Sequence, residues 1–144
     1  MHNITKMKIL KPAHEVYESF VDPVKIGNFW FSSSSTRWEP GKTITLKYKE
    51  YNAQGEIDIL EIEPNKKIVF SWGANGEGHK VTMTFNEVEP STTIVEVLEE
   101  GFEAQDLEGI GQLLDNKEGW VFMLTCLKGY LECGMNQLRT GLVK

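Results

Sequence analysis

Residue types that commonly carry catalysis or bind metals are sparse in this sequence and far apart. The histidines His2, His14 and His79 fall in separate segments, and neither an H-E-x-x-H nor a C-x-x-C motif occurs. Motifs of that kind bring zinc ligands, or a nucleophile and its base, together on one helix or loop, and this sequence has none of them. We therefore expect no metal, no cofactor and no catalytic residue.

Two cysteines, Cys126 and Cys133, lie seven residues apart in a segment with helical periodicity. At about 1.5 Å of helix rise per residue their Cα atoms are about 10 Å apart, which is too far for a disulfide. We expect two free thiols that serve as small core residues, consistent with a reducing, cytoplasmic location.

Two further patterns resemble functional motifs but have simpler interpretations. The glycine-rich segment Gly73–Lys80 resembles a phosphate-binding loop, yet His79 stands where lysine is needed and the segment joins two expected strands. We interpret it as a hairpin loop. Glu56, Asp58, Glu61 and Glu63 are close in sequence, and strand alternation predicts a solvated face for them.

Negative charge is concentrated in the second half of the chain. The net charge is -6, and no Lys or Arg occurs between Val81 and Asn116. The same stretch contains an acidic tract, Glu96, Glu99, Glu100, Glu103, Asp106 and Glu108. Such a surface repels phosphate backbones, so we expect no nucleic-acid partner. We interpret the tract as a solvated edge and loop, with a docking patch for a basic protein as the alternative.

The hydrophobic pattern predicts mainly antiparallel strands in the first two thirds of the chain. A strand is expected at Asn3–Leu10, then a short helix after Pro12 and another after Asp22-Pro23, and then a loop at Ser32–Ser35. Alternation of apolar residues follows from Thr43 to Glu99, with turn-length links between strands. No apolar run reaches 18 residues, so no membrane span is expected.

Helical periodicity returns in the last third. Trp120, Met123, Leu124, Leu127, Leu131 and Leu138 recur on one helical face, which predicts a long helix from about Asn116 to Arg139. Leu107–Leu114 is expected as a separate short helix. The 144 residues show no repeat or linker, so we expect one domain over residues 1–144.

Read in this order, the elements resemble the Aha1-like (AHSA1) family of the SRPBCC, START or Bet v 1-like superfamily. The resemblance rests on Ile9–Tyr17, on Asp22-Pro23 with Trp30, on Gly55–Trp72 with its Ile62-Glu63-Pro64, and on Gly119-Trp120 with the leucines after it. It implies an α+β helix-grip fold: a curved antiparallel sheet of six to seven strands around a long C-terminal helix, with two short helices after the first strand.

The resemblance also implies a cavity between the sheet and the C-terminal helix. We expect a small hydrophobic ligand there, bound by aromatic and methionine side chains with Tyr48 or Arg37 as polar groups. The expected ligand-binding residues are Trp30, Trp38, Tyr48, Phe70, Trp72, Met83, Trp120, Met123 and Leu127. The alternatives are a co-chaperone module that binds an Hsp90-type chaperone, and a polyketide-cyclase-like enzyme that uses Tyr48 or His79. Either a monomer or a homodimer fits the sequence.

Overall fold

The computed structural model describes residues 1–73, 78–103 and 105–143, which form one sheet of seven antiparallel strands in the order β1-β7-β6-β5-β4-β3-β2. The strands are β1 His2–Ile9, β2 Ser33–Ser34, β3 Thr43–Tyr48, β4 Ala53–Glu63, β5 Lys67–Trp72, β6 His79–Glu89 and β7 Thr92–Glu100. This confirms the predicted sheet. One strand, β2, lies in the serine run that we expected to be a loop, where Ser33 and Ser34 pair with Lys47 and Leu46 of β3.

The segment after β1 contains one true helix, α1 (Ala13–Val21), which begins after Pro12 as predicted. The second short helix is only a single 3-10 turn, η1 (Ile26–Asn28). The Asp22 carboxylate accepts a hydrogen bond from the Val24 backbone N–H at 2.9 Å, which favours a turn over a continuing helix. Val24 is 84% exposed and does not contribute to the core.

The long helix, α2 (Leu107–Cys133), has different ends from those predicted. It begins earlier because Asp106 caps it, accepting a hydrogen bond from the Gly109 N–H at 2.8 Å. Residues Leu107–Leu114 are therefore its first turns and not a separate helix. It ends at Gly134, whose φ of 67° is typical of a helix C-cap. Leu138 lies beyond that end, in the 3-10 turn η4 (Leu138–Thr140).

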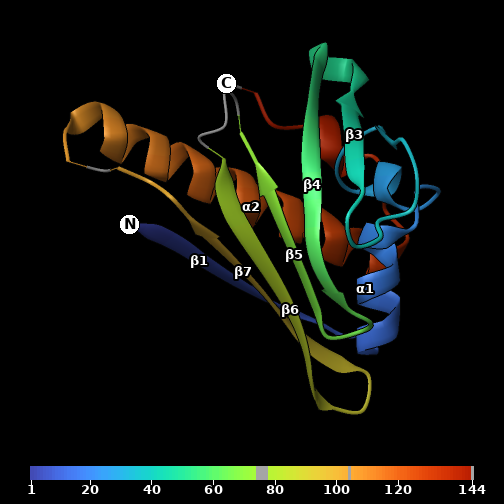
Figure 1. The fold of residues 1–144 in the computed structure, drawn as a ribbon. Coiled ribbons are helices and arrows are strands. Elements are labelled where there is room, and N and C mark those ends of the chain that lie inside the picture. The colour runs from blue at the N-terminus through green and yellow to red at the C-terminus, as the bar shows by residue number, and fades with distance from the viewer. Residues whose placement is uncertain (74–77, 104, 144) are drawn as a thin grey trace.

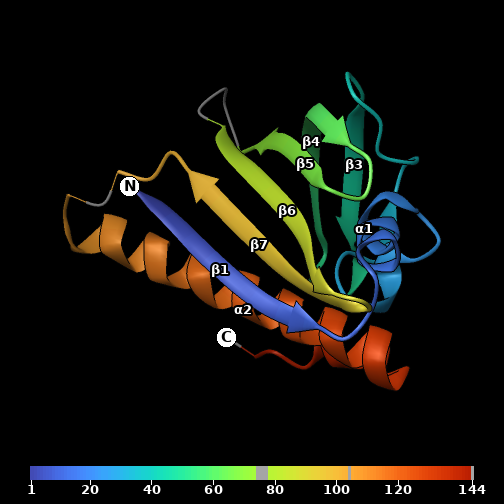
Figure 2. The same ribbon diagram turned by 90° about the horizontal axis from the view of Figure 1, so that it is seen from below.

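The sheet curves, and α2 crosses its concave side, while α1 packs near one end (Figures 1 and 2). Alternate side chains of the strands and one face of α2 meet in the core. Fully or almost fully buried members are Ile44, Leu46, Ile57, Ile59, Ile68, Phe70, Val81, Met83, Val95, Val97, Leu124 and Leu127. This arrangement is the predicted helix-grip fold.

Charged side chains mostly lie where alternation predicted. Glu56, Asp58, Glu61 and Glu63 of β4 are exposed, as are most members of the acidic tract. Glu96 is half-buried, and Glu99 is 2% exposed and points inward, which corrects the interpretation of the whole tract as solvated.

None of the helices in the described part of the chain has the length and apolarity needed to span a bilayer.

Candidate functional site

Three tryptophans fill the middle of the hollow between sheet and helix. The ring centres of Trp30 and Trp120 are 5.5 Å apart, those of Trp72 and Trp120 are 5.4 Å apart, and those of Trp30 and Trp72 are 6.1 Å apart. These distances are typical of packed aromatic pairs. Trp30 lines one pocket and Trp72 lines another, so the tryptophan cluster lies between the two.

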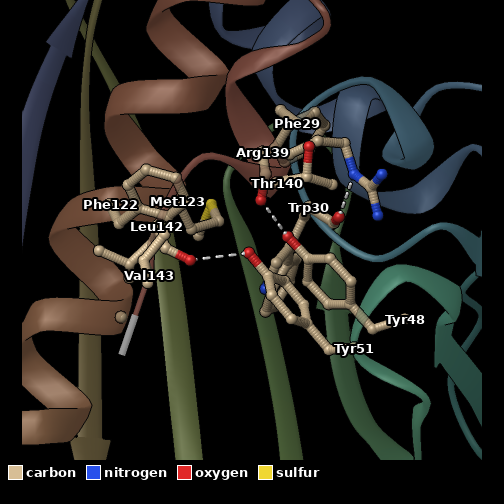
Figure 3. A pocket seen from close by; sticks show the side chains of 11 residues that line it. Phe29, Trp30, Tyr48, Tyr51, Phe122, Met123, Arg139, Thr140, Leu142 and Val143 are labelled. Atoms are coloured by element: carbon tan, nitrogen blue, oxygen red, sulfur yellow. Dashed lines mark hydrogen bonds between the residues drawn. The ribbon is translucent and has the colours of Figure 1, made fainter.

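The first pocket, here called the C-terminal pocket, has a volume of about 630 Å³. Its walls come from four parts of the chain: the segment after α1, the end of β3 with turn η2 (Lys49–Tyr51), the middle of α2, and the C-terminal segment 139–143 (Figure 3). Its lining residues are Phe29, Trp30, Tyr48, Tyr51, Gly119, Phe122, Met123, Arg139, Thr140, Leu142 and Val143. The volume and the mainly apolar lining match those of ligand pockets in other proteins.

Two tyrosine hydroxyls attach the C-terminal segment to the sheet side of this pocket. Tyr48 donates a hydrogen bond to the Arg139 carbonyl oxygen at 2.6 Å, and Tyr51 donates to the Leu142 carbonyl oxygen at 3.1 Å. Figure 3 shows the hydroxyls of Tyr48 and Tyr51 directed towards the backbone of this segment. The segment after α2 is therefore a wall of the pocket.

Arg139 is the first residue of this wall; it is buried, and its charge is neutralised. Its guanidinium forms an ion pair with Glu50 at 2.9 Å, donates through Nε to the Trp30 carbonyl oxygen at 2.6 Å, and donates to Ser32 Oγ at 3.0 Å. The hydrogen bonds from Arg139 and then Ser32 lower the pKa of Glu50 to about 2. Burial raises the pKa of Tyr48 to about 12, so its hydroxyl stays protonated. The pocket thus has polar groups but little net charge.

A second pocket, here called the histidine pocket, lies on the other side of the tryptophan cluster and has a volume of about 940 Å³. Its walls include side chains from β3, β4, β5, β6 and the first half of α2. Among them are Leu46, Ile57, Trp72, His79 and Gln112, and Phe31 from the segment before β2 also lines the pocket.

The residues predicted to bind a ligand separate into three groups in the structure. Trp30, Tyr48 and Met123 line the C-terminal pocket, and Trp72 lines the histidine pocket. The others are buried in the core: Trp38, Phe70, Met83, Trp120 and Leu127. Arg37 lies away from both pockets and forms a surface ion pair with Glu18 at 2.7 Å. Tyr48 and His79, the residues that a cyclase would need, line different pockets.

Several lining residues of the C-terminal pocket were not predicted as site residues. Tyr51 and Arg139 lie in short 3-10 turns, where no periodicity indicates which way a side chain points. Phe122 is two residues from the buried Trp120 and so lies off the predicted helical face. Only the surplus of aromatic residues near this face could have suggested Phe122 as a site residue.

The cysteines differ in environment. Cys126 is 2% exposed, and burial raises the pKa of its thiol. Cys133 is exposed at the end of α2, which corrects its assignment to the core. Both are free thiols. Among residues 1–73, 78–103 and 105–143, no three His, Cys, Asp or Glu side chains are grouped so as to hold a metal ion.

Comparison with known families gives one match that covers most of the chain. The family model described as "Activator of Hsp90 ATPase homolog 1-like protein" matches residues 11–132. Among curated proteins, none matches the sequence significantly.

Several solved structures share this fold. The protein SSP2350 from Staphylococcus saprophyticus is 53% identical, with 94% of this chain and 95% of that chain covered and a TM-score of 0.84. The Aha1 dimer from Colwellia psychrerythraea is 17% identical over 93% of this chain and 98% of that one, with a TM-score of 0.81. An HSP90 activator from Plasmodium falciparum is 18% identical over 93% and 96%, with a TM-score of 0.72. The last two similarities concern the fold alone.

Proposed function

The chain belongs to the family of activator of Hsp90 ATPase homolog 1-like proteins, and from this premise we propose that it is a non-enzymatic binding domain for a small hydrophobic molecule. The observation that carries the proposal is the C-terminal pocket, whose volume of about 630 Å³ is bounded mainly by aromatic and aliphatic side chains. An apolar surface of this kind gains free energy when an apolar ligand replaces water.

The electrostatics of the pocket favour a neutral ligand. Arg139 is the charged residue of its lining, and Glu50 already compensates that charge. The hydroxyls of Tyr48 and Tyr51 donate to backbone carbonyl oxygens, so they can still accept a hydrogen bond from a ligand. We therefore propose an apolar or amphipathic ligand without a formal charge, bound in the cytoplasm, where the two free thiols would persist.

A glycine on α2 provides a test that fills the pocket without disturbing the core. Gly119 lines the C-terminal pocket, and a Cβ added there meets no atom within 4 Å. Gly119→Leu should place its side chain in the pocket, and the gain in helix propensity should keep the protein folded. Gly111→Leu is the matched control, because Gly111 lies on the same helix with equal space but lines neither pocket.

The measurement is a fluorescence titration with Nile red, a neutral dye that responds to an apolar environment. We expect about one equivalent of dye to bind the wild type and Gly111→Leu, and at least tenfold weaker binding to Gly119→Leu. Equal binding by all three proteins, or no binding to the wild type, would contradict the proposal.

A co-chaperone role is the second candidate, and the family match supports it. The start of α2 combines exposed acidic residues, Glu103, Asp106 and Glu108, with Leu107, which is 88% exposed. Such a surface suits a basic partner with an apolar contact, and binding led by charge weakens as salt increases. Titration with an Hsp90-type chaperone at two salt concentrations tests the co-chaperone role. The double variant that carries both Glu103→Lys and Glu108→Lys should abolish binding. Gly119→Leu should leave it unchanged.

A further inference from the structure

A buried carboxylate lies at the edge of the histidine pocket, where β6, β7 and α2 meet. The side chain of Glu99 is 2% exposed. Its Oε1 accepts hydrogen bonds from Trp120 Nε1 at 3.0 Å and from Asn116 Nδ2 at 3.1 Å, and its Oε2 lies 2.6 Å from His79 Nδ1. Burying a carboxylate is costly unless donors surround it. Glu99 therefore has a complete set of partners, and the imidazole of His79 is one of them.

The orientation of these groups is determined by a further residue on β1. Asn3 Nδ2 donates to the Leu113 carbonyl oxygen at 2.8 Å and to Asn116 Oδ1 at 3.0 Å. Because Asn116 uses its oxygen to accept from Asn3, its nitrogen must face Glu99. Glu99 Oε1 consequently accepts from two donors, and Oε2 remains as the acceptor for His79.

The imidazole of His79 is also held from its other side. Gly101 lies against it, since a Cβ added at Gly101 would be 2.8 Å from His79 Cδ2. Gly101 has a φ of 116°, a conformation that favours glycine. The ring of Phe102 has its centre 4.3 Å from that of His79. Packing and the hydrogen bond together fix the position of the imidazole.

This arrangement leaves one ring nitrogen for a ligand. When neutral His79 donates its Nδ1–H to Glu99, Nε2 has no proton and is an acceptor. The side chain is 29% exposed and lines the histidine pocket, and Nε2 has no hydrogen-bond partner within the described residues.

From this geometry we propose that the histidine pocket is a second binding site, which takes a planar aromatic molecule with a hydroxyl group. The hydroxyl donates to His79 Nε2, and the aromatic body packs against the half-buried rings of Trp72 and Phe31. The adjoining hollow beyond His79 is lined by Glu103, Asp106 and Glu108, so an anionic ligand would be repelled. This site is separated from the C-terminal pocket by the tryptophan cluster and does not depend on the function proposed for that pocket.

Three naphthalene derivatives that differ only in their hydrogen-bonding group test the proposal. 2-Naphthol can donate a hydrogen bond, 2-methoxynaphthalene has lost that donor, and 2-acetylnaphthalene offers a carbonyl acceptor. We expect the wild type to bind 2-naphthol about five- to tenfold more tightly than either of the others, the ratio that one ordinary hydrogen bond supplies. Nitrogen-15 spectra of the histidine ring should show a protonated Nδ1 and an unprotonated Nε2 that shifts when 2-naphthol binds.

An isosteric substitution should reverse this preference. In Glu99→Gln the amide oxygen can still accept from Trp120 and Asn116, and the amide nitrogen then donates to His79 Nδ1. The imidazole must then carry its proton on Nε2, so 2-acetylnaphthalene should bind more tightly than 2-naphthol. His79→Phe, which keeps a ring in place, should bind all three compounds equally.

Gly119→Leu separates the two pockets and should leave the affinity for 2-naphthol unchanged. The proposal is wrong if Gly119→Leu weakens 2-naphthol binding, because the compound then occupies the C-terminal pocket. It is also wrong if the wild type does not prefer 2-naphthol, if Nε2 carries the proton, or if Glu99→Gln leaves the preference as it was.

Discussion

Tyr48 and Arg139 are joined by two contacts. The tyrosine hydroxyl donates to the arginine carbonyl oxygen at 2.6 Å, and the guanidinium carbon lies 4.7 Å from the centre of the tyrosine ring. The pair links strand β3 to a segment 91 residues later in the chain. Because that segment is a wall of the C-terminal pocket, the same contacts contribute to stability and to the shape of the pocket.

Tyr48→Phe should loosen the C-terminal segment without unfolding the protein. The Arg139 carbonyl oxygen loses its donor, while the ring still lies against the guanidinium, so we expect a loss of about 1 kcal/mol in the free energy of unfolding. Hydrogen exchange should accelerate in residues 138–143. Tyr51→Phe is the control, since its bond to Leu142 is exposed and longer, and it should cost less. Unchanged exchange in Tyr48→Phe would show that the segment is held by other contacts.

The Arg139–Glu50 ion pair should make stability depend on acid pH. The pKa of Glu50 is lowered to about 2 in the folded protein by the hydrogen bond from Arg139, against an ordinary value of 4.5. A lowered pKa means that the stabilisation is present above pH 4.5 and is lost as the pH falls from 4.5 to about 2. The melting temperature of the wild type should therefore exceed that of Glu50→Gln at pH 7, and the difference should shrink across this range.

Arg139→Met serves as the control for that experiment. Without the guanidinium, Glu50→Gln should have a much smaller pH-dependent effect, because Arg139 is the first cause of the lowered pKa and only the weaker hydrogen bonds, such as that from Ser32, remain. A pH-dependent difference of undiminished size in the Arg139→Met background would assign the effect to another group.

Trp120 should contribute to stability through both packing and a hydrogen bond. It is 3% exposed and donates to the buried Glu99. Trp120→Ala should cost about 3 to 5 kcal/mol, as large aromatic deletions in cores do. Trp120→Phe keeps part of the volume but removes one of the donors to Glu99, and it should cost about 1 to 3 kcal/mol. Denaturant titration measures both, and a loss below about 1 kcal/mol for Trp120→Ala would contradict the packing described here.

The two thiols should differ in reactivity. Cys133 is exposed, whereas Cys126 is buried and its pKa is raised by burial. Since the thiolate is the reactive form, a disulfide reagent such as DTNB should modify one thiol per native chain and the second only after unfolding. Cys133→Ser should abolish the first reaction. Modification of both thiols in the native protein would indicate that the α2 core opens.

The strands and the apolar face of the helix could be predicted because their periodicity is local. Ile44, Ile57, Phe70 and Val81 follow strand alternation and are buried as expected. The same alternation could have identified the inward positions of His79 and Glu99. His79 lies on the face of β6 that carries Val81 and Met83, and Glu99 lies on the face of β7 that carries Val95 and Val97. Their polarity concealed this, because an inward glutamate is stable only when partners from other elements surround it.

The sequence by itself therefore determined the main strands and the long helix, the fold and the family. Only the tertiary structure decided which aromatic residues fill the hollow and which remain along pockets. The physical reason is that periodicity specifies the face of an element, whereas a cavity depends on how side chains from distant segments fit together. Trp30, Trp72 and Trp120 lie in three such segments, and their contact divides the hollow. Arg139 closes one side of it through bonds to residues about ninety to one hundred and ten positions earlier.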